Sequence, residues 1–358
     1  MGPRPFFPVT SRRDFFRLGA AAAASTLGLP GCAVIGAAAG GGWSKSQLEA
    51  AEAVARRNGG KGWAAWNGIL EVSAWQTHER SQALSITKSL AGLGATRASQ
   101  EGWLGATERV AETIHEWKGD ARKSRITVLM LLQQTAGLDA AGTALYHGVI
   151  GDKGAVAVSR PALDEPGAQF RYGPECWEVL AELLQRKLSA RGENLENFMV
   201  RGVMSPLGIS SPKWRTDRKG RYYLSTGAEL EVADLGRLGR TLGRLLRGEN
   251  SAGFNASRFA EMSRVSGANP MFGAGIWRNS NARKSGASAI EVESALDPAR
   301  SPSFWQAACL SRRLPPSFCG LIGSGGRRVF IWPDENKVVA RLGSSNSWED
   351  RPFLNALS

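Results

Sequence analysis

The sequence predicts an α/β protein of two lobes: an antiparallel sheet flanked by helices and built from both ends of the chain, and an inserted, mainly helical lobe. Two observations carry this prediction. Segments with the aromatic, β-branched and turn-forming residues typical of strands occur near the start, at 62–75, and again near the end, at 271–279 and 323–343. Between them apolar residues follow helical spacing, and we place the helical lobe at roughly 90–225.

Helices are expected wherever apolar residues recur every three or four positions. In chain order these segments are 44–58, 83–97, 126–139, 166–188 after an initial turn, 198–210, 231–248 and 348–357. Gly137 is expected to end the third of them. The strands at 62–75 read as a short hairpin, and "PDEN" reads as the turn within 323–343. Residues 279–318 are rich in Ser, Ala, Arg and Pro and are expected to be an insertion loop.

The first 42 residues are predicted to be an export signal and linker, and residues 43–358 the folded domain. "SRRDFF" (residues 11–16) precedes an apolar segment too short to span a bilayer as a mature helix, and this pattern resembles a bacterial twin-arginine export signal. "LPGC" resembles a lipoprotein processing site at which Cys32 would be acylated and would anchor the protein to a membrane. A plain cleavage site within "AVIGAAAGGG" is the alternative. We expect a periplasmic protein or a membrane-anchored lipoprotein.

Charge and cysteine content narrow the function classes. The formal net charge is +13, which would suit an anionic partner, but export and the absence of a basic stripe interleaved with aromatic residues argue against nucleic acid. Apart from Cys32 there are three cysteines, and only Cys309 and Cys319 are close enough in sequence to suggest a disulfide. No segment has recognisable metal-ligand spacing, and we expect neither a metal nor another cofactor.

The segment "ALSITKSLAG" (residues 83–92) contains the candidate nucleophile. If it is helical, Ser85 and Lys88 lie one turn apart on the same face, roughly 5–6 Å between Cβ atoms. A serine hydroxyl needs a base to take its proton, and lysine can serve only if its pKa is lowered by desolvation or by a nearby cation. A solvated surface pair is the alternative. The same spacing recurs at Ser210 and Lys213, but Pro212 makes a helix unlikely there.

The order of the later motifs decides between these alternatives. "SITK" is followed by "ITVLMLLQQTAGL", "PGAQFRYGPECWEVLAELL", "SPLGI", "ELEVADLGRLG", "FGAGIW" and "GSGGRRVFIWP". This ordered set resembles the serine β-lactamase and penicillin-binding superfamily, specifically the hydrolases and esterases similar to class C β-lactamases. The resemblance covers about residues 60–345.

The resemblance implies roles for individual residues. Ser85 would be the nucleophile, Lys88 its base, and Tyr172 a proton relay, acting as tyrosinate or through hydrogen bonds. The backbone amides of Ser85 and Ser324 would form the oxyanion hole. The glycine-rich third motif would place the remaining substrate-binding candidates in the cleft, which are Gly323, Gly325 and Arg327.

Two departures from the family pattern bear on the substrate. Pro174 stands where the family often has the asparagine of Tyr-x-Asn, and "LIG", residues 321–323, stands where it has Lys-Thr-Gly or His-x-Gly. Arg327 or Arg328 could replace the missing cation, but on a strand only one of them faces the cleft. We therefore expect an exported serine hydrolase acting on small esters or amides through an acyl-enzyme. The alternatives are a β-lactamase or D-Ala-D-Ala-type peptidase acting on cell-wall peptides, and an envelope-binding lipoprotein with weak or no catalysis.

Overall fold

The computed structural model describes residues 42–140, 145–146, 151–210, 212–296, 300–345 and 347–358. The expected export signal, its paired arginines and Cys32 lie outside these residues and stay predictions.

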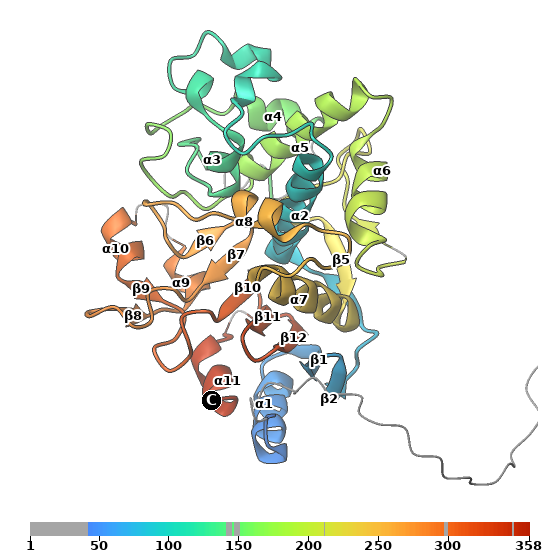
Figure 1. The fold of residues 1–358 in the computed structure, drawn as a ribbon, viewed down its shortest axis with the longest axis vertical. Helices are drawn as coiled ribbons and strands as arrows, with labels where there is room; N and C mark the ends of the chain where they lie inside the picture. Colours follow the sequence, from blue (N-terminus) through green and yellow to red (C-terminus); the bar gives the residue numbers. More distant parts are fainter. Residues whose placement is uncertain (1–41, 141–144, 147–150, 211, 297–299, 346) are drawn as a thin grey trace, which may run out of the picture. The chain divides into compact units, whose positions relative to one another are not determined.

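A seven-stranded antiparallel sheet forms the centre of the fold, in the order β2-β1-β12-β11-β10-β7-β6 (Figure 1). Two strands come from the N-terminal part of the chain and five from the C-terminal third, as the sequence predicted. The bounds are β1 (Gly60–Asn67), β2 (Leu70–Trp75), β6 (Phe272–Gly273), β7 (Ile276–Arg278), β10 (Cys319–Gly323), β11 (Arg327–Trp332) and β12 (Lys337–Gly343).

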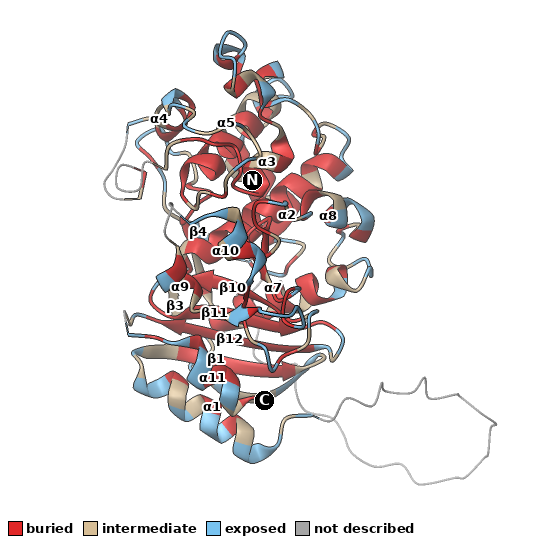
Figure 2. Ribbon diagram, turned by 90° about the vertical axis from the view of Figure 1, so that its left-hand side faces the viewer, coloured by how far each residue is buried: buried red, intermediate tan, exposed pale blue. Residues whose placement is uncertain are grey.

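Helices cover both faces of this sheet. Along β11, Val329 and Ile331 point toward α7 (Val232–Leu246), whereas the ring of Phe330 lies 6.1 Å from that of Phe353 in α11 (Asp350–Ala356). This alternation is the two-residue period of a strand. The N-terminal helix α1 (Lys45–Arg57) packs beside α11, with its exposed residues turned outward (Figure 2). The sheet is therefore buried between two helical layers.

A mainly helical part lies beyond one end of the sheet in both ribbon views (Figures 1 and 2). Within the described residues, the segment 90–225 adds no strand to the seven-stranded sheet. Its helices are α3 (Val128–Leu132), α4 (Lys153–Ser159), α5 (Glu175–Ser189) and α6 (Leu195–Met199), the last continued by one π-helical turn (Val200–Met204). Helix α8 (Ala256–Met262) and a small sheet of β3 (Arg80–Gln82), β5 (Ala228–Glu231) and β4 (Lys213–Trp214) complete the junction with the main sheet.

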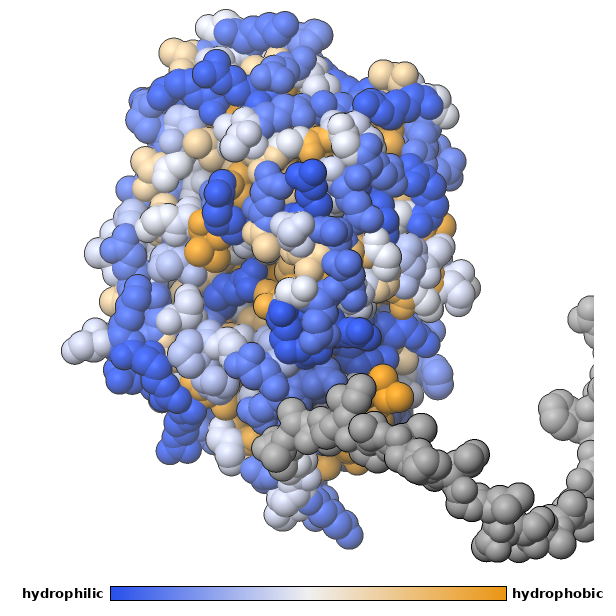
Figure 3. All heavy atoms as spheres, in the orientation of Figure 1, coloured by the Kyte–Doolittle hydropathy of each residue, from blue (hydrophilic) through white to orange (hydrophobic). Residues whose placement is uncertain are grey.

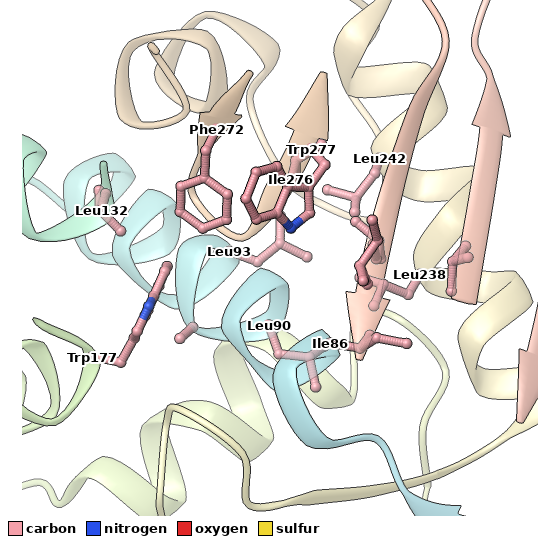
Figure 4. Packing of buried hydrophobic residues seen from close by; sticks show 14 of the residues in the cluster. Ile86, Leu90, Leu93, Leu132, Trp177, Leu238, Leu242, Phe272, Ile276 and Trp277 are labelled. Atoms are coloured by element: carbon pink, nitrogen blue, oxygen red, sulfur yellow. The ribbon is translucent and has the colours of Figure 1, made fainter. Parts of the chain in front are cut away.

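Helix α2 (Thr87–Gln100) runs between the sheet and the helical part, and nearly all of its residues are buried. Its apolar side chains Leu90 and Leu93 lie in the same cluster as Phe272 and Trp277 from the sheet edge and Trp177 from α5 (Figure 4). The helix is thus packed against neighbouring elements on several sides, which fixes the position of its N-terminal end.

Two expectations about local structure are corrected. The helix expected over 126–139 is only five residues long, because the chain turns at Gln134 (φ +54°) and Gly137 (φ +74°). A Cβ on Gly137 would lie 2.4 Å from the carbonyl oxygen of Asp164, so the turn requires glycine. The insertion at 279–318 is not simply a loop: it contains β8 (Ser288–Ala289), α9 (Val292–Ala295), α10 (Pro302–Gln306) and β9 (Ala308–Cys309).

The suggested disulfide between Cys309 and Cys319 is not formed. Both thiols are free and buried. Cys319 lies in β10 of the main sheet, opposite Ile331, whereas Cys309 lies in β9 and packs in a separate small cluster with Ala282 and Ala287. The two cysteines belong to different packing units, and closeness in sequence did not bring their side chains together.

The face in Figure 3 is mainly hydrophilic, and its hydrophobic residues occur in small groups. Among the described helices, none combines the length and the apolar character needed to cross a membrane.

The contact between α7 and the sheet gives a stability prediction. A methyl group at Gly239 would lie 2.6 Å from Cγ1 of Val338 and 2.7 Å from Cγ1 of Val329, whereas at Gly243 it would meet only Cγ2 of Ile331, at 3.2 Å. We expect overpacking by Gly239→Ala to cost about 1–3 kcal/mol, of which the better helix propensity of alanine offsets up to about 1 kcal/mol. Urea unfolding should therefore give a lower free energy of unfolding for Gly239→Ala than for the control Gly243→Ala. Equal values would contradict the close approach.

Candidate active site

Ser85 lies in a single 3₁₀ turn, residues 84–86, directly before α2. The preceding residue, Leu84, has a φ of +48°, which is uncommon for a residue with a side chain. The strand β5 holds this turn on both sides: Ala83 N donates to Ala228 O at 2.8 Å, and Ala228 N donates to Thr87 Oγ1 at 3.1 Å. Ser85 therefore stands at the N-terminal end of a helix on a strained, firmly held turn.

Two close backbone contacts complete the frame around this turn. A Cβ on Gly323, at the end of β10, would lie 2.6 Å from Ala83 O, so β10 ends directly against the turn. The β6–β7 turn lies on the first residues of α2, where Ser89 Oγ donates to Gly275 O at 2.9 Å. The turn at residues 84–86, named the nucleophile turn after the expected role of Ser85, is thus fixed by β5, β10 and the β6–β7 turn. These three elements are far apart in sequence.

Lys88 is completely buried and points back to Ser85. Its Nζ lies 3.0 Å from Ser85 Oγ and donates to Ser225 O, also at 3.0 Å. Burial lowers the pKa of Lys88 to about 7, although the acidic side chains of Glu178 and Glu175, where ionised, act in the opposite direction. A substantial fraction of Lys88 is therefore neutral near pH 7 and able to accept the proton of Ser85.

Tyr172 lies beside both Lys88 and Ser85. The ammonium of Lys88 lies 4.9 Å from the centre of the Tyr172 ring. Burial raises the pKa of Tyr172, and a hydrogen bond with Ser85 only partly opposes this shift. Tyr172 is therefore a neutral phenol at neutral pH, which disfavours the tyrosinate form of the expected relay and favours transfer through hydrogen bonds.

An aromatic wall stands beside Tyr172. Its ring lies 5.9 Å from those of both Phe272 and Trp277, and the Trp277 ring lies 5.8 Å from that of Trp305. Trp305 belongs to α10, inside the insertion at 279–318. The insertion therefore packs behind the buried aromatic rings that support Tyr172.

The third-motif residues divide into two groups. Gly323 lies against the nucleophile turn, and Ser324, which follows it, is exposed. In contrast, Gly325 N donates to the Glu293 carboxylate at 3.2 Å, and Arg327 donates to Gln82 O at 2.5 Å and to Ser324 O at 2.7 Å. The polar groups of Gly325 and Arg327 are thus engaged with protein atoms, and the arginine ties the third motif to the segment before Ser85.

Arg328 also forms its contacts within the protein interior. It is buried and pairs with Asp350 at 2.6 Å and with Glu293 at 2.7 Å. The side chains of Leu321 and Ile322, at the positions where the family offers a cation, are buried and apolar. Both arginines are thus engaged with protein atoms, and the expectation that one of them replaces the missing cation finds no support in these contacts.

The second Ser-x-x-Lys lacks this geometry. Lys213 lies in the short strand β4 and Ser210 in the loop before it, so the two do not share a helix face.

The structure also brings to the site residues that the sequence did not single out. Tyr146 lies beside Lys88, whose Nζ is 5.7 Å from the centre of its ring. Glu175 and Glu178 are buried on α5, and burial raises the pKa of Glu175 to about 8. Two acidic residues three positions apart on the apolar face of an amphipathic helix were the available signal for this pair.

A cavity of about 460 Å³ lies away from these residues. It is bordered mainly by α7, α8 and the turn between β11 and β12, with Leu245, Phe259 and Pro333 in its wall. It is therefore separate from the site at Ser85.

The arrangement at Ser85 has the parts required for acyl transfer. A serine hydroxyl and a desolvated amine are in contact, a phenol lies beside both, and the serine stands at a helix N-terminus, whose dipole favours negative charge. This set of groups can deprotonate an alcohol and return the proton to a leaving group.

Comparison with solved structures gives the same fold. A putative β-lactamase from Bacteroides dorei superposes with a TM-score of 0.65 at 14% identity, covering 88% of this chain and 98% of that chain. A family VIII carboxylesterase gives 0.60 at 13% identity, covering 88% and 98%. A D-stereospecific amidohydrolase from Streptomyces sp. gives 0.59 at 16% identity, covering 87% and 97%.

No curated protein matches the chain. The β-lactamase family model, however, matches residues 36–357, which is nearly the whole sequence. Together with the shared fold, this match means that the chain belongs to the β-lactamase family of serine hydrolases and penicillin-binding proteins.

Proposed function

We propose that this protein is a serine hydrolase that cleaves small carboxylic esters or amides through an acyl-enzyme on Ser85. The observation that carries the proposal is the contact of 3.0 Å between Ser85 Oγ and the Nζ of Lys88, an amine that burial holds partly neutral at pH 7. Ser-Lys contact together with a lowered amine pKa supplies both the nucleophile and its base.

The proposed reaction proceeds in two halves. Lys88 Nζ takes the proton of Ser85 as Oγ forms a bond to the substrate carbonyl carbon, and the carbonyl oxygen becomes an oxyanion. The backbone amides of Ser85 and Ser324 would donate to this oxygen. Its collapse breaks the bond to the leaving group, which receives the proton from Lys88 directly or through the Tyr172 hydroxyl. Water then releases the acid by the same route in reverse, with Lys88 again as base.

The charges around the site support esters and neutral amides as substrates. Leu321 and Ile322 provide no cation, and Arg327 and Arg328 are bonded to protein carbonyls and carboxylates. A β-lactam or a peptide ending in a free carboxylate would lack the partner that the family usually supplies. Structures of similar fold that are described as a carboxylesterase and an amidohydrolase agree with this preference.

A protein that only binds in the envelope is the alternative from another class. The missing asparagine and lysine favour it, whereas the close, buried contact of Ser85 with Lys88 speaks against it. A covalent probe separates the two functions.

Labelling with a fluorophosphonate tests the nucleophile. We expect the protein from residue 43 onward to be labelled, Ser85→Ala to be unlabelled, and Ser210→Ala, at the second Ser-x-x-Lys, to be labelled like the wild type. Intact-mass spectrometry gives the stoichiometry. Absence of labelling in the wild type, or equal labelling of Ser85→Ala, would contradict the assignment and favour a binding protein.

The lowered pKa of Lys88 predicts the pH dependence. Because protonated Lys88 cannot accept the proton of Ser85, kcat/KM for a short acyl ester should rise with pH and reach half its plateau near pH 7. Stopped assays between pH 5 and 9 in buffers of constant ionic strength measure this limb. A midpoint between pH 4 and 5 would point instead to an ordinary carboxylate as the base.

Substrate preference is tested by comparing turnover of p-nitrophenyl acetate and butyrate with that of a chromogenic cephalosporin. We expect kcat/KM to be at least about tenfold higher for the esters, because no cation is positioned to hold the cephalosporin carboxylate, and a charge-assisted contact in a binding site contributes about 1.5–3 kcal/mol. Ser85→Ala serves as the control for background hydrolysis. Fast cephalosporin turnover would overturn the ester preference.

A further inference from the structure

A buried ion pair lies behind the catalytic lysine. Nζ of Lys153, in α4, is 2.6 Å from Oε2 of Glu178, in α5, and the two side chains are 1% and 0% exposed. Burying two charges costs free energy that their attraction often does not recover, and well-packed apolar residues would commonly serve the fold as well. The pair therefore calls for a reason beyond packing.

A continuous set of hydrogen bonds leads from this pair to the nucleophile. Oε1 of Glu178 accepts from Ser225 N at 2.9 Å, and Ser225 O accepts from Lys88 Nζ at 3.0 Å. Lys88 Nζ in turn lies 3.0 Å from Ser85 Oγ. Glu178 thus accepts a hydrogen bond from the backbone N–H of Ser225, and the backbone carbonyl of the same residue accepts one from Lys88.

Lys153 is itself fixed at both ends. Its backbone N donates to Asp217 Oδ2 at 3.1 Å, and its Nζ lies 5.6 Å from the centre of the Tyr223 ring. Helices α4 and α5 also approach closely, since a Cβ on Gly154 would lie 2.4 Å from Oε2 of Glu182. The ammonium of Lys153 therefore occupies a defined position from which it orients the Glu178 carboxylate.

We propose that Glu178, oriented by Lys153, is a positioning residue that fixes the catalytic amine of Lys88 through the backbone of Ser225. Glu178 has no hydrogen bond to Ser85, and it acts on Lys88 through the backbone of Ser225 and through its charge. The inference rests on the proposed function, in which Lys88 is the base.

The charges of the pair also act on the protonation of Lys88. The groups that face Lys88 are Tyr146, Tyr172, Glu175 and Glu178, and the carboxylate of Glu178 favours the protonated amine. Neutralising Glu178 should lower the pKa of Lys88. Removing Lys153 leaves Glu178 buried without its cation, and such a carboxyl group tends to take up a proton, as burial favours for Glu175. The change that tests the effect of the carboxylate is therefore the one at Glu178.

The first experiment measures the acid limb of kcat/KM for a short acyl ester in Glu178→Gln and in the double variant Lys153→Met/Glu178→Gln. Both variants lack the Glu178 carboxylate. We expect the midpoint to move down by roughly half to one pH unit in Glu178→Gln, and by less in the double variant, which also lacks the Lys153 cation. A midpoint of Glu178→Gln that stays within about 0.2 unit of the wild type, or that moves up, would overturn the inference.

The second experiment separates position from charge and does not require the single variants to fold. Lys153→Met/Glu178→Gln keeps an acceptor for Ser225 N, whereas Lys153→Met/Glu178→Leu does not, and neither pair contains a buried charge. We expect at least about tenfold lower kcat/KM and slower fluorophosphonate labelling for the leucine variant, since the buried amide of Ser225 would lose its acceptor and Ser225 would shift. Equal rates would show that the hydrogen bond to Ser225 is not needed.

Different results would contradict the proposed function and the proposed role of Glu178. If the wild type is labelled at Ser85 but the acid limbs and the double variants do not differ as described, the serine hydrolase proposal stands and only the role of Glu178 is lost. If the wild type is not labelled at Ser85, the proposed function itself fails.

Discussion

The burial of the Lys88 amine is the constraint on which the rest of the site depends. An ammonium in bulk water would stay protonated at neutral pH and could not activate Ser85. Burial lowers its pKa to about 7, and the protein then has to supply partners for an amine that solvent cannot reach. It does so with Ser85 Oγ and Ser225 O, each 3.0 Å away. The surrounding aromatic rings and acidic side chains set the balance between the neutral and charged forms.

Keeping the amine in contact with the serine requires a rigid frame, and the fold provides it from segments distant in sequence. The nucleophile turn is tied to β5 by backbone hydrogen bonds, and β10 ends against it at Gly323, where a larger residue would collide with Ala83 O. Helix α2 is packed along nearly its whole length. These contacts explain how the unusual backbone conformation of Leu84 is maintained: the surrounding structure holds it in place.

The arginines of the third motif bond to protein atoms of the same frame and are not free to bind an anionic substrate. Arg327 spans Gln82 O and Ser324 O, and Arg328 neutralises Asp350 and Glu293. Buried arginines so engaged stabilise the third motif and its hairpin, but they present no free guanidinium to a carboxylate. A serine in contact with a buried amine, with buried aromatic rings behind Tyr172 and no free arginine nearby among the third-motif residues, suits neutral acyl compounds, which is the basis of the ester and amide proposal.

Local pattern was sufficient to predict the antiparallel sheet from both chain ends and most of the helices, because periodicity is written in neighbouring residues. The family resemblance, carried by the order of the motifs, was needed to single out Ser85, Lys88 and Tyr172, whose side chains the structure brings together. It was insufficient for the helix at 126–139, where contacts with Asp164 favour a turn, and for a disulfide between cysteines in different packing units. Tertiary structure alone decided which charges meet: that Arg327 and Arg328 are used internally, and that Glu178, Lys153 and Ser225 stand behind Lys88. Electrostatic partners are set by distances in space and by burial, and neither is encoded in the spacing of residues along the chain.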